Sequence, residues 1–263
     1  MTVDFLKDVL LGAGEILKAG FGSVNEIRTK QDQSNVVTES DYKSEEFIRS
    51  AISGTYPAHN ILGEENGFEN RGNKYTWVVD PLDGTSNFAA QIPWFGVLVA
   101  LIENHEPVLA GAYLPMSDEL YFATREGGAY KNDIRIVASK EVDLKNLLFC
   151  YSLDFSKDPD KTEREAQIIK SLVQNFRNLR STNSCVDFCY AAEGKIGVAI
   201  NQTMKMWDIA SMHLILEEAG AKVTGIKGND IEYHPSERSL EQNFTAIAAN
   251  PAIHGKILDL IGM

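Results

Sequence analysis

The spacing of the apolar residues changes along this 263-residue chain, and each change limits the folds open to it. Residues 5–19 place their apolar side chains on one helical stripe, and a second helix is predicted over 39–53. The pattern then becomes that of strands, with short β-branched and aromatic runs at 75–79, 95–102, 108–114, 119–124 and 128–130. The first half of the chain therefore predicts two helices beside an antiparallel sheet.

The helix predicted over 39–53 has a start signal in the sequence. Thr38 and Asp41 have the spacing of a capping box, in which each side chain accepts a hydrogen bond from the other residue's backbone N–H. The helical period then predicts an inward face made of Phe47, Ile48, Ala51 and Ile52.

Strands and helices alternate in the second half of the chain. The expected strands are 147–151, 196–200 and 246–249, and the expected helices are 162–176, 184–193 and 208–219. Asn250 and Pro251 are a good N-cap and first position for a terminal helix. The two patterns meet near residue 145. We therefore predict a layered α/β (α+β) fold, an αβαβα sandwich of two packed subdomains, 1–145 and 146–263.

Composition excludes several classes of protein. Hydrophobic residues make up 44% and charged residues 24%, which is ordinary for a globular protein and excludes disorder. The net charge of −12 and the lack of a basic patch predict no nucleic-acid partner and no membrane partner. The three dispersed cysteines and the lack of a signal peptide predict a cytoplasmic protein. Cys185 and Cys189 have no further ligands nearby, so buried thiols are expected rather than zinc.

The segment from Trp77 to Phe88 carries the clearest signal for chemistry. A buried strand ends in Asp80 and Asp83, and Pro81 between them removes a backbone donor, so the Leu82 carbonyl can turn toward the acids. Such oxygen-only ligands suit a hard cation, Mg²⁺ before Zn²⁺.

A helix start follows directly after these acids. The N–H groups of Gly84 and Thr85 at that start suit an anion such as phosphate. A cation beside a phosphate pocket is the arrangement for phosphoryl-ester chemistry. An isolated Asp-Gly pair, however, is more often a simple turn.

Two further segments end in acids. Gly63-Glu64-Glu65 follows an apolar run, and Trp207-Asp208-Ile209-Ala210 begins a predicted helix. Taken alone, the glutamates fit a solvated loop edge and Asp208 fits an N-cap. Together with Asp80-Pro81-Leu82-Asp83-Gly84-Thr85-Ser86-Asn87-Phe88, they resemble the signatures of the inositol monophosphatase family of Mg²⁺-dependent phosphatases. The resemblance covers nearly the whole chain, and it implies a fold of the sugar-phosphatase type and a homodimer.

The resemblance also implies a set of metal ligands. Glu64, Asp80 and the Leu82 carbonyl would hold one Mg²⁺, and Asp80, Asp83 and Asp208 would hold a second. A third, weaker ion would bind nearby, and Mn²⁺ could replace Mg²⁺. Two cations sharing a carboxylate fit a two-metal phosphoryl-transfer site.

Catalytic residues follow from the same resemblance. Glu64 and Thr85 would orient the attacking water, Asp41 would lie near that water, and Lys30 aligns with a loop lysine of the family. The substrate or its phosphate would be bound by Asp83, Gly84, Thr85, Ser184, Asn201, Lys205 and Asp208.

The sequence departs from the family pattern at the positions that choose the substrate. Asn201 stands where inositol-hydrolysing members have a glutamate, Lys205 stands where a histidine is common, and Ser184 lies in an altered segment. Asn201 can still bind a polyol, and Lys205 would favour a second anionic group, unless it only lies along the Trp207 helix.

The leading interpretation is a Mg²⁺-dependent phosphomonoesterase that acts on inositol monophosphate or a related sugar phosphate. The alternatives in the family are fructose-1,6-bisphosphatase, histidinol-phosphate phosphatase, 3′-phosphoadenosine-5′-phosphate phosphatase and NADP phosphatase. A regulatory binding protein with vestigial activity is the alternative from another class.

Overall fold

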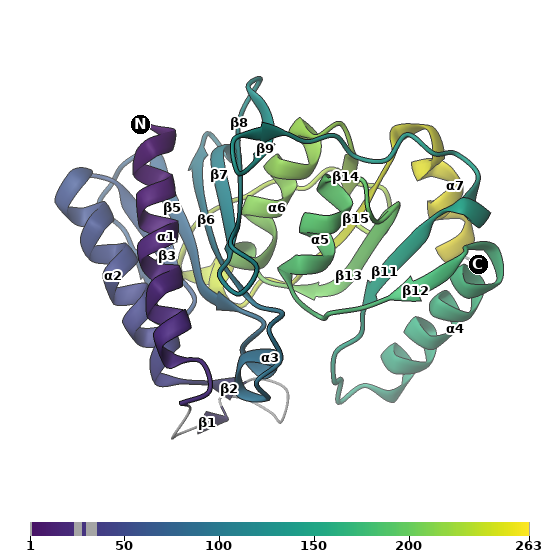
Figure 1. Cartoon of the computed structure of the whole chain (residues 1–263), viewed down its shortest axis with the longest axis horizontal. Helices are drawn as coiled ribbons and strands as arrows, with labels where there is room; N and C mark the ends of the chain where they lie inside the picture. The colour runs from purple at the N-terminus through teal and green to yellow at the C-terminus, as the bar shows by residue number, and fades with distance from the viewer. Residues whose placement is uncertain (1, 24–27, 30–35, 263) are drawn as a thin grey trace.

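The computed structural model describes residues 2–23, 28–29 and 36–262 of the chain (Figure 1). Its α-helices are α1 (Val3–Gly20), α2 (Glu39–Thr55), α3 (Thr85–Ala89), α4 (Pro159–Asn175), α5 (Cys185–Ala192), α6 (Met206–Glu218) and α7 (Pro251–Ile261). Two short 3-10 helices lie at Leu144–Asn146 and Glu237–Leu240.

The strands form two large mixed sheets and a small ribbon. The eight-stranded sheet has the order β10-β9-β8-β7-β6-β5-β3-β4. Its strands are β3 (Asn60–Gly63), β4 (Gly67–Glu69), β5 (Tyr75–Asp83), β6 (Gly96–Glu103), β7 (Glu106–Leu114), β8 (Glu119–Thr124), β9 (Gly128–Lys131) and β10 (Ile134–Arg135). The five-stranded sheet, in the order β12-β11-β13-β15-β14, has β11 (Leu148–Ser152), β12 (Asn178–Arg180), β13 (Val198–Met204), β14 (Lys222–Thr224) and β15 (Phe244–Ala249). The ribbon pairs β1 (Arg28–Thr29) with β2 (Val36–Val37).

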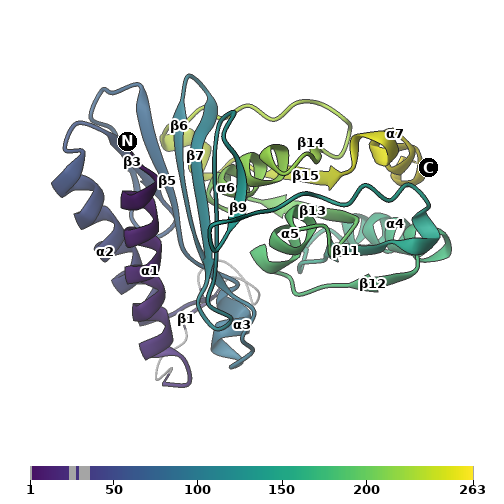
Figure 2. The same cartoon turned by 45° about the horizontal axis from the view of Figure 1, so that its top comes forward.

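Helices and sheets alternate in five layers. α1 and α2 cover one face of the eight-stranded sheet, α5 and α6 lie between the two sheets, and α4 and α7 cover the outer face of the five-stranded sheet (Figures 1 and 2). One apolar core fills the space under each helical layer. The predicted αβαβα sandwich of the α/β class is therefore confirmed.

Helix α6 joins the two halves of the molecule. It belongs to the second half of the chain, yet it packs against β5, β6, β7 and β8 of the first sheet as well as β13, β14 and β15 of the second. This packing crosses the predicted subdomain bounds, 1–145 and 146–263. The bounds themselves stay a prediction. In the part of the chain that the structure describes, none of the helices is long and apolar enough to cross a bilayer.

The predicted helices and longer strands agree with the structure to within a few residues. The β6–β7 hairpin turns at Asn104 and His105, whose φ angles of 50° and 71° suit the right-handed twist of a hairpin. The sequence does not predict β4, β10, β12 and β14, because runs of two or three residues carry no readable period.

The inward face predicted for α2 is partly wrong. Ile48 and Ile52 are fully buried, but Phe47 is 38% exposed, and its ring covers Gly12 of α1 rather than entering the sheet core. The buried stripe is completed instead by Asp41, Ser44 and Glu45, which are polar. A prediction that counts only apolar residues therefore places the buried face of α2 about one residue away from its true position.

Candidate active site

The end of β5 brings two acids to one cavity. Asp80 and Asp83 are three residues apart, so a regular strand would point them to opposite faces. The pairing with β6 shifts from Asp80–Leu98 to Asp83–Gly96, which leaves one extra residue in β5 between the acids. Pro81, which has no N–H to give to the ladder, lies in this bulge. Because of the bulge, both acids line the same cavity.

Asp208 joins these acids from the start of α6. Its Oδ2 accepts the N–H of Lys205 at 2.7 Å, so Asp208 caps the helix from the third helical position, and the N-cap residue is Lys205 rather than Asp208. Asp208 also lies beside the end of β5: one carboxylate oxygen each from Asp80, Asp83 and Asp208 lies within 4.8 Å of the other two. A set of three carboxylates suits Mg²⁺ or Mn²⁺ better than a soft metal.

Burial raises the pKa of all three acids, and repulsion from neighbouring carboxylates adds to it. Burial is the largest cause in each case. The pKa values of Asp80 and Asp208 rise well above their usual range, and the negative charges of Asp83 and Glu64 contribute to both shifts. Burial raises the pKa of Asp83 to about 6, although the N–H of Cys185 donates to its Oδ2. A divalent cation would remove this repulsion, so the residues present fit a metal.

Glu64 reaches the same cavity from the end of β3. Its backbone N–H donates to the carbonyl of Val79 at 3.2 Å, which joins the residue to β5 just before Asp80. Its carboxylate contributes to the raised pKa of Asp80 and Asp208. The predicted fourth acid is therefore near the other three.

Thr85 connects Asp41 to the cavity. Its hydroxyl Oγ1 lies 2.9 Å from the Leu82 carbonyl oxygen and 3.2 Å from Asp41 Oδ1. Asp41 is fully buried and does not line the cavity itself. Its Oδ2 accepts the N–H of Thr38 at 2.8 Å and the Thr38 hydroxyl at 2.6 Å. The capping box is confirmed, and the same carboxylate faces Thr85.

Gly84 makes the close approach of the two halves possible. Its φ is +83°, a backbone conformation that is strained for residues with a side chain. A Cβ on this residue would lie 2.8 Å from the carbonyl oxygen of Trp94 and 3.0 Å from the Cβ of Ser184. The position therefore requires glycine both for its backbone angle and for its space.

Gly84→Ala is expected to lower the free energy of unfolding by about 3 kcal/mol, because strain and a backbone contact add. Urea unfolding followed by circular dichroism measures this. Gly54→Ala is the matched control: Gly54 lies in α2 with no neighbour within 4 Å of an added Cβ. That substitution should leave stability unchanged or raise it by up to about 1 kcal/mol. Equal effects of the two changes would contradict the proposed strain at Gly84.

The second half of the chain supplies the opposite wall of the cavity. Ser184 is the N-cap residue of α5, and its Oγ lies 3.0 Å from that of Thr182. Asn201 lies at a bulge of β13, where its Oδ1 accepts the N–H of Thr203 at 2.7 Å. Lys205 donates from Nζ to the carbonyl of Glu241 at 3.2 Å. These three residues line the cavity, as do the other predicted substrate residues, Asp83, Gly84, Thr85 and Asp208.

Several cavity residues are missing from the sequence prediction. They are Glu65, Leu153, Asp154, Phe155, Asn183, Thr203, Glu241 and Asn243, among others. Two of them have a sequence signal. Glu65 belongs to the Gly63-Glu64-Glu65 segment, and Asn183 is a residue type that tolerates its φ of 55°; its Nδ2 donates to Asp154 at 2.7 Å. Lys30 lies outside the described residues.

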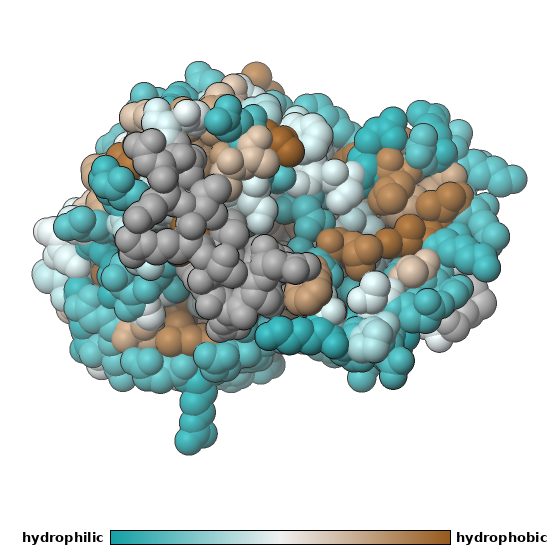
Figure 3. Space-filling view, turned by 90° about the horizontal axis from the view of Figure 1, so that it is seen from below, coloured by the Kyte–Doolittle hydropathy of each residue, from teal (hydrophilic) through white to brown (hydrophobic). Residues whose placement is uncertain are grey.

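The cavity also has an apolar edge. Figure 3 shows apolar surface on the lower face of the half that carries the five-stranded sheet. Leu153 and Phe155, which belong to this half, line the cavity and remain 40% and 43% exposed. A substrate in the cavity would meet carboxylates at one side and apolar side chains at the other.

The model of the inositol monophosphatase family matches residues 2–262. The chain belongs to this family. It is 33% identical over 228 residues to the fructose-1,6-bisphosphatase/inositol-1-monophosphatase of Aquifex aeolicus, with 84% of each chain covered. It is also 34% identical over 219 residues to the Nus factor SuhB of Vibrio cholerae, with 82% of each covered.

Solved structures agree with this membership. The inositol monophosphatase of Thermotoga maritima superposes with a TM-score of 0.87 at 26% identity, over 99% of this chain and 96% of that one. The suhB protein of Bartonella henselae gives 0.89 at 25% identity, over 98% and 97%. Membership of this inositol monophosphatase family supports phosphatase activity in general, while the names of the relatives differ in substrate and role.

Proposed function

We propose that this inositol monophosphatase family member is a Mg²⁺-dependent phosphomonoesterase that hydrolyses inositol monophosphate or a related sugar phosphate by two-metal activation of water. One observation carries the proposal: Asp80, Asp83 and Asp208 meet within 4.8 Å at the wall of a cavity of about 880 Å³. That volume suits a small phosphate ester. The Aquifex relative, whose name includes inositol-1-monophosphatase, supports the choice of substrate.

The cations would be held by Glu64, Asp80, the Leu82 carbonyl, Asp83 and Asp208, with Asp80 shared. When bound, they neutralise charge on the phosphoryl oxygens and on the leaving alkoxide and lower the pKa of water. Mn²⁺ would fit the same oxygen ligands.

Thr85 and Asp41 would accept the proton of the attacking water. The Thr85 hydroxyl is at hydrogen-bond distance from Asp41 Oδ1, and Thr38 holds the other oxygen of that carboxylate. Thr85 can therefore orient water and pass its proton to Asp41 Oδ1. Glu64 would help to hold the water in line with the phosphorus atom.

The phosphoryl oxygens would be bound by backbone N–H groups at Gly84, Thr85 and Ser184. The start of α5 already holds one anion, since the N–H of Cys185 donates to Asp83. A helix start of this kind favours negative charge. Asn201 would contact the hydroxyl groups of the sugar or polyol.

A panel of phosphate esters tests the proposal. Phosphate release would be measured from inositol 1-phosphate, fructose 1,6-bisphosphate, histidinol phosphate and 3′-phosphoadenosine 5′-phosphate, with Mg²⁺ and with chelator. We expect Mg²⁺-dependent turnover that is fastest on inositol 1-phosphate. A clear lead for another ester would replace the substrate and keep the phosphatase class.

A substitution of Lys205 tests whether the substrate is a monophosphate or a bisphosphate. Lys205→Met is expected to lower kcat/KM about tenfold for fructose 1,6-bisphosphate, because one charge-assisted hydrogen bond is lost. For inositol 1-phosphate the change should stay within about twofold to threefold. Lys145→Met, at a surface 3-10 helix, is the control for loss of one positive charge. A parallel fall for both esters would show that Lys205 does not read a second phosphate.

A regulatory binding role is the second candidate, and the likeness to the Nus factor SuhB of Vibrio cholerae favours it. If no ester of the panel releases phosphate although the protein binds metal, this role would be supported over the enzymatic one. We also propose a homodimer, by the family resemblance, which light scattering of the purified protein would test.

A further inference from the structure

Helix α2 presents buried polar side chains where a core helix would present apolar ones. Asp41, Ser44 and Glu45 have 0% exposure, and Ile48 and Ile52 continue the same stripe at helical spacing. Burying an acid or a hydroxyl is unfavourable unless it is hydrogen-bonded. The polar part of the stripe therefore needs specific partners.

Each of the three polar residues contacts a different segment of the candidate active site. Asp41 contacts Thr85 at the start of α3. Ser44 donates from Oγ to the Pro81 carbonyl at 2.8 Å, in the bulge of β5. Glu45 contacts the turn that follows β3, which includes Glu64. The N-terminal half of α2 thus connects three separate segments of the site.

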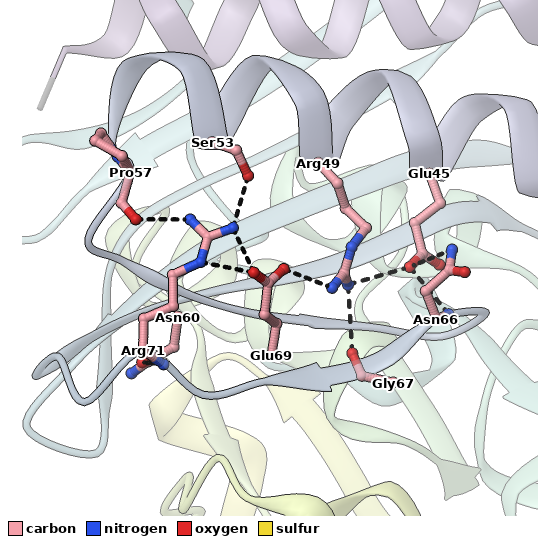
Figure 4. A network of polar contacts seen from close by, with 9 residues as sticks. All are labelled: Glu45, Arg49, Ser53, Pro57, Asn60, Asn66, Gly67, Glu69 and Arg71. Atoms are coloured by element: carbon pink, nitrogen blue, oxygen red, sulfur yellow. Dashed lines mark hydrogen bonds and ion pairs between the residues drawn. The ribbon is translucent and has the colours of Figure 1, made fainter.

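Glu45 accepts several hydrogen bonds from this turn (Figure 4). Its Oε2 accepts the N–H of Glu65 at 2.7 Å, and its Oε1 accepts the N–H and the Nδ2 of Asn66, both at 3.1 Å. The carboxylate also fills the space beside Gly63, where an added Cβ would lie 2.2 Å from Oε1. One side chain therefore fixes the residues on both sides of Glu64.

Arg49 ties the same carboxylate to the far side of the turn. Its Nη1 lies 3.4 Å from Glu45 Oε1 and 3.3 Å from the Gly67 carbonyl oxygen. Its Nη2 donates to Glu69 at 3.1 Å, and Arg71 contacts Glu69 as well (Figure 4). Beyond Glu69, whose side chain is 44% exposed, the network continues through Arg71 to Ser53 and Pro57. The buried end of the network faces the site, and the exposed end does not.

We propose that Glu45 is a positioning residue for the metal site, holding the 64–66 turn so that Glu64 faces the cluster of Asp80, Asp83 and Asp208. This inference rests on the proposed function. Hydrogen bonds to backbone N–H groups fix the turn itself rather than a rotatable side chain. Groups that orient metal ligands in this way contribute strongly to metal affinity.

Mn²⁺ binding to the full-length protein tests the inference without any turnover, because electron paramagnetic resonance reports the free Mn²⁺. Glu45→Gln replaces one acceptor oxygen by an NH₂ group that opposes the N–H donors. We expect the dissociation constant to rise by about tenfold to a hundredfold. Glu45→Asp keeps the charge but is one methylene too short, so a similar rise is expected.

Glu69→Gln is the matched control, since it removes one charge from the exposed end of the same network. Its Mn²⁺ affinity should match that of the wild type. Thermal unfolding in chelator is measured for all variants. A purely structural role of Glu45 predicts lower stability with unchanged Mn²⁺ affinity, and that result would overturn the proposal.

Further outcomes of these measurements test the positioning role and the proposed function separately. Wild-type affinity in Glu45→Asp would mean that charge matters rather than the hold on the turn, which overturns positioning. If both Glu45 variants fail to fold, Asn66→Ala removes one contact of the carboxylate, and an affinity unchanged from wild type would again overturn it. If the wild type neither binds Mn²⁺ nor hydrolyses any ester, the proposed function is wrong, and the positioning role that rests on it is wrong with it. Binding by the wild type with unaltered variants overturns the positioning role alone.

Discussion

Replacing Asp83 by asparagine is expected to lower kcat about a thousandfold, corresponding to about 4 kcal/mol of lost transition-state stabilisation. Asparagine has nearly the same shape and keeps an oxygen that can accept the N–H of Cys185. It removes one of the negative charges that would hold a divalent cation. The loss should therefore fall on metal binding and turnover and not on the fold.

A stability measurement separates this effect from misfolding. Because burial raises the pKa of Asp83 to about 6, its charge opposes folding at neutral pH when no metal is bound. Asp83→Asn should consequently raise Tm in the presence of chelator. Asp133→Asn is the control, since it removes one charge at an exposed ion pair with Lys7. Near wild-type turnover by Asp83→Asn would contradict the two-metal proposal.

Removal of divalent cations is expected to lower Tm by about 5–10 °C relative to saturating Mg²⁺. At a hundred times the dissociation constant, a ligand adds about 2.7 kcal/mol, and one kcal/mol corresponds to about 2–4 °C for a domain near this size. The physical cause is the burial of these acids together with their repulsion: burial is the largest cause of the raised pKa values of Asp80 and Asp208, and the charges of Asp83 and Glu64 add to both. Scanning calorimetry with chelator and with Mg²⁺ measures the difference.

The same scan on Asp208→Asn provides the comparison. The variant should be more stable than wild type in chelator and should gain less from Mg²⁺, because it lacks one ligand and one repulsive charge. NaCl at matched ionic strength controls for general screening. An equal shift with NaCl and with MgCl₂ would argue against a specific cation site.

The grouping of the acids could be anticipated from the sequence, but its geometry could not. The resemblance to the inositol monophosphatase family groups Asp80, Asp83 and Asp208, and the structure brings their oxygens within 4.8 Å. The bulge that allows this depends on the pairing of β5 with β6, which a single strand's sequence does not encode. Their roles as metal ligands stay a prediction.

Other parts of the site depend on contacts between distant segments. Glu45 has no motif that distinguishes it from a surface glutamate, because its partners are backbone N–H groups some 20 residues away. Asp154 and Phe155 enter the cavity only through the path of the loop after β11. The layered fold, in contrast, follows from local periods, since whole helices and strands carry them.

The position of α6 has a consequence for how such a protein can diverge. Asp208 lies on a helix packed against the sheet that carries Asp80 and Asp83, so the acids share one rigid support although they come from different halves of the sequence. Asp154 follows β11, Asn183 lies between β12 and α5, and Asn201 is in β13. Substitutions in those segments can change the shape offered to a ligand while the helix and the sheet that carry the acids stay in place. The ligand can therefore change during evolution while the arrangement of the three acids is retained.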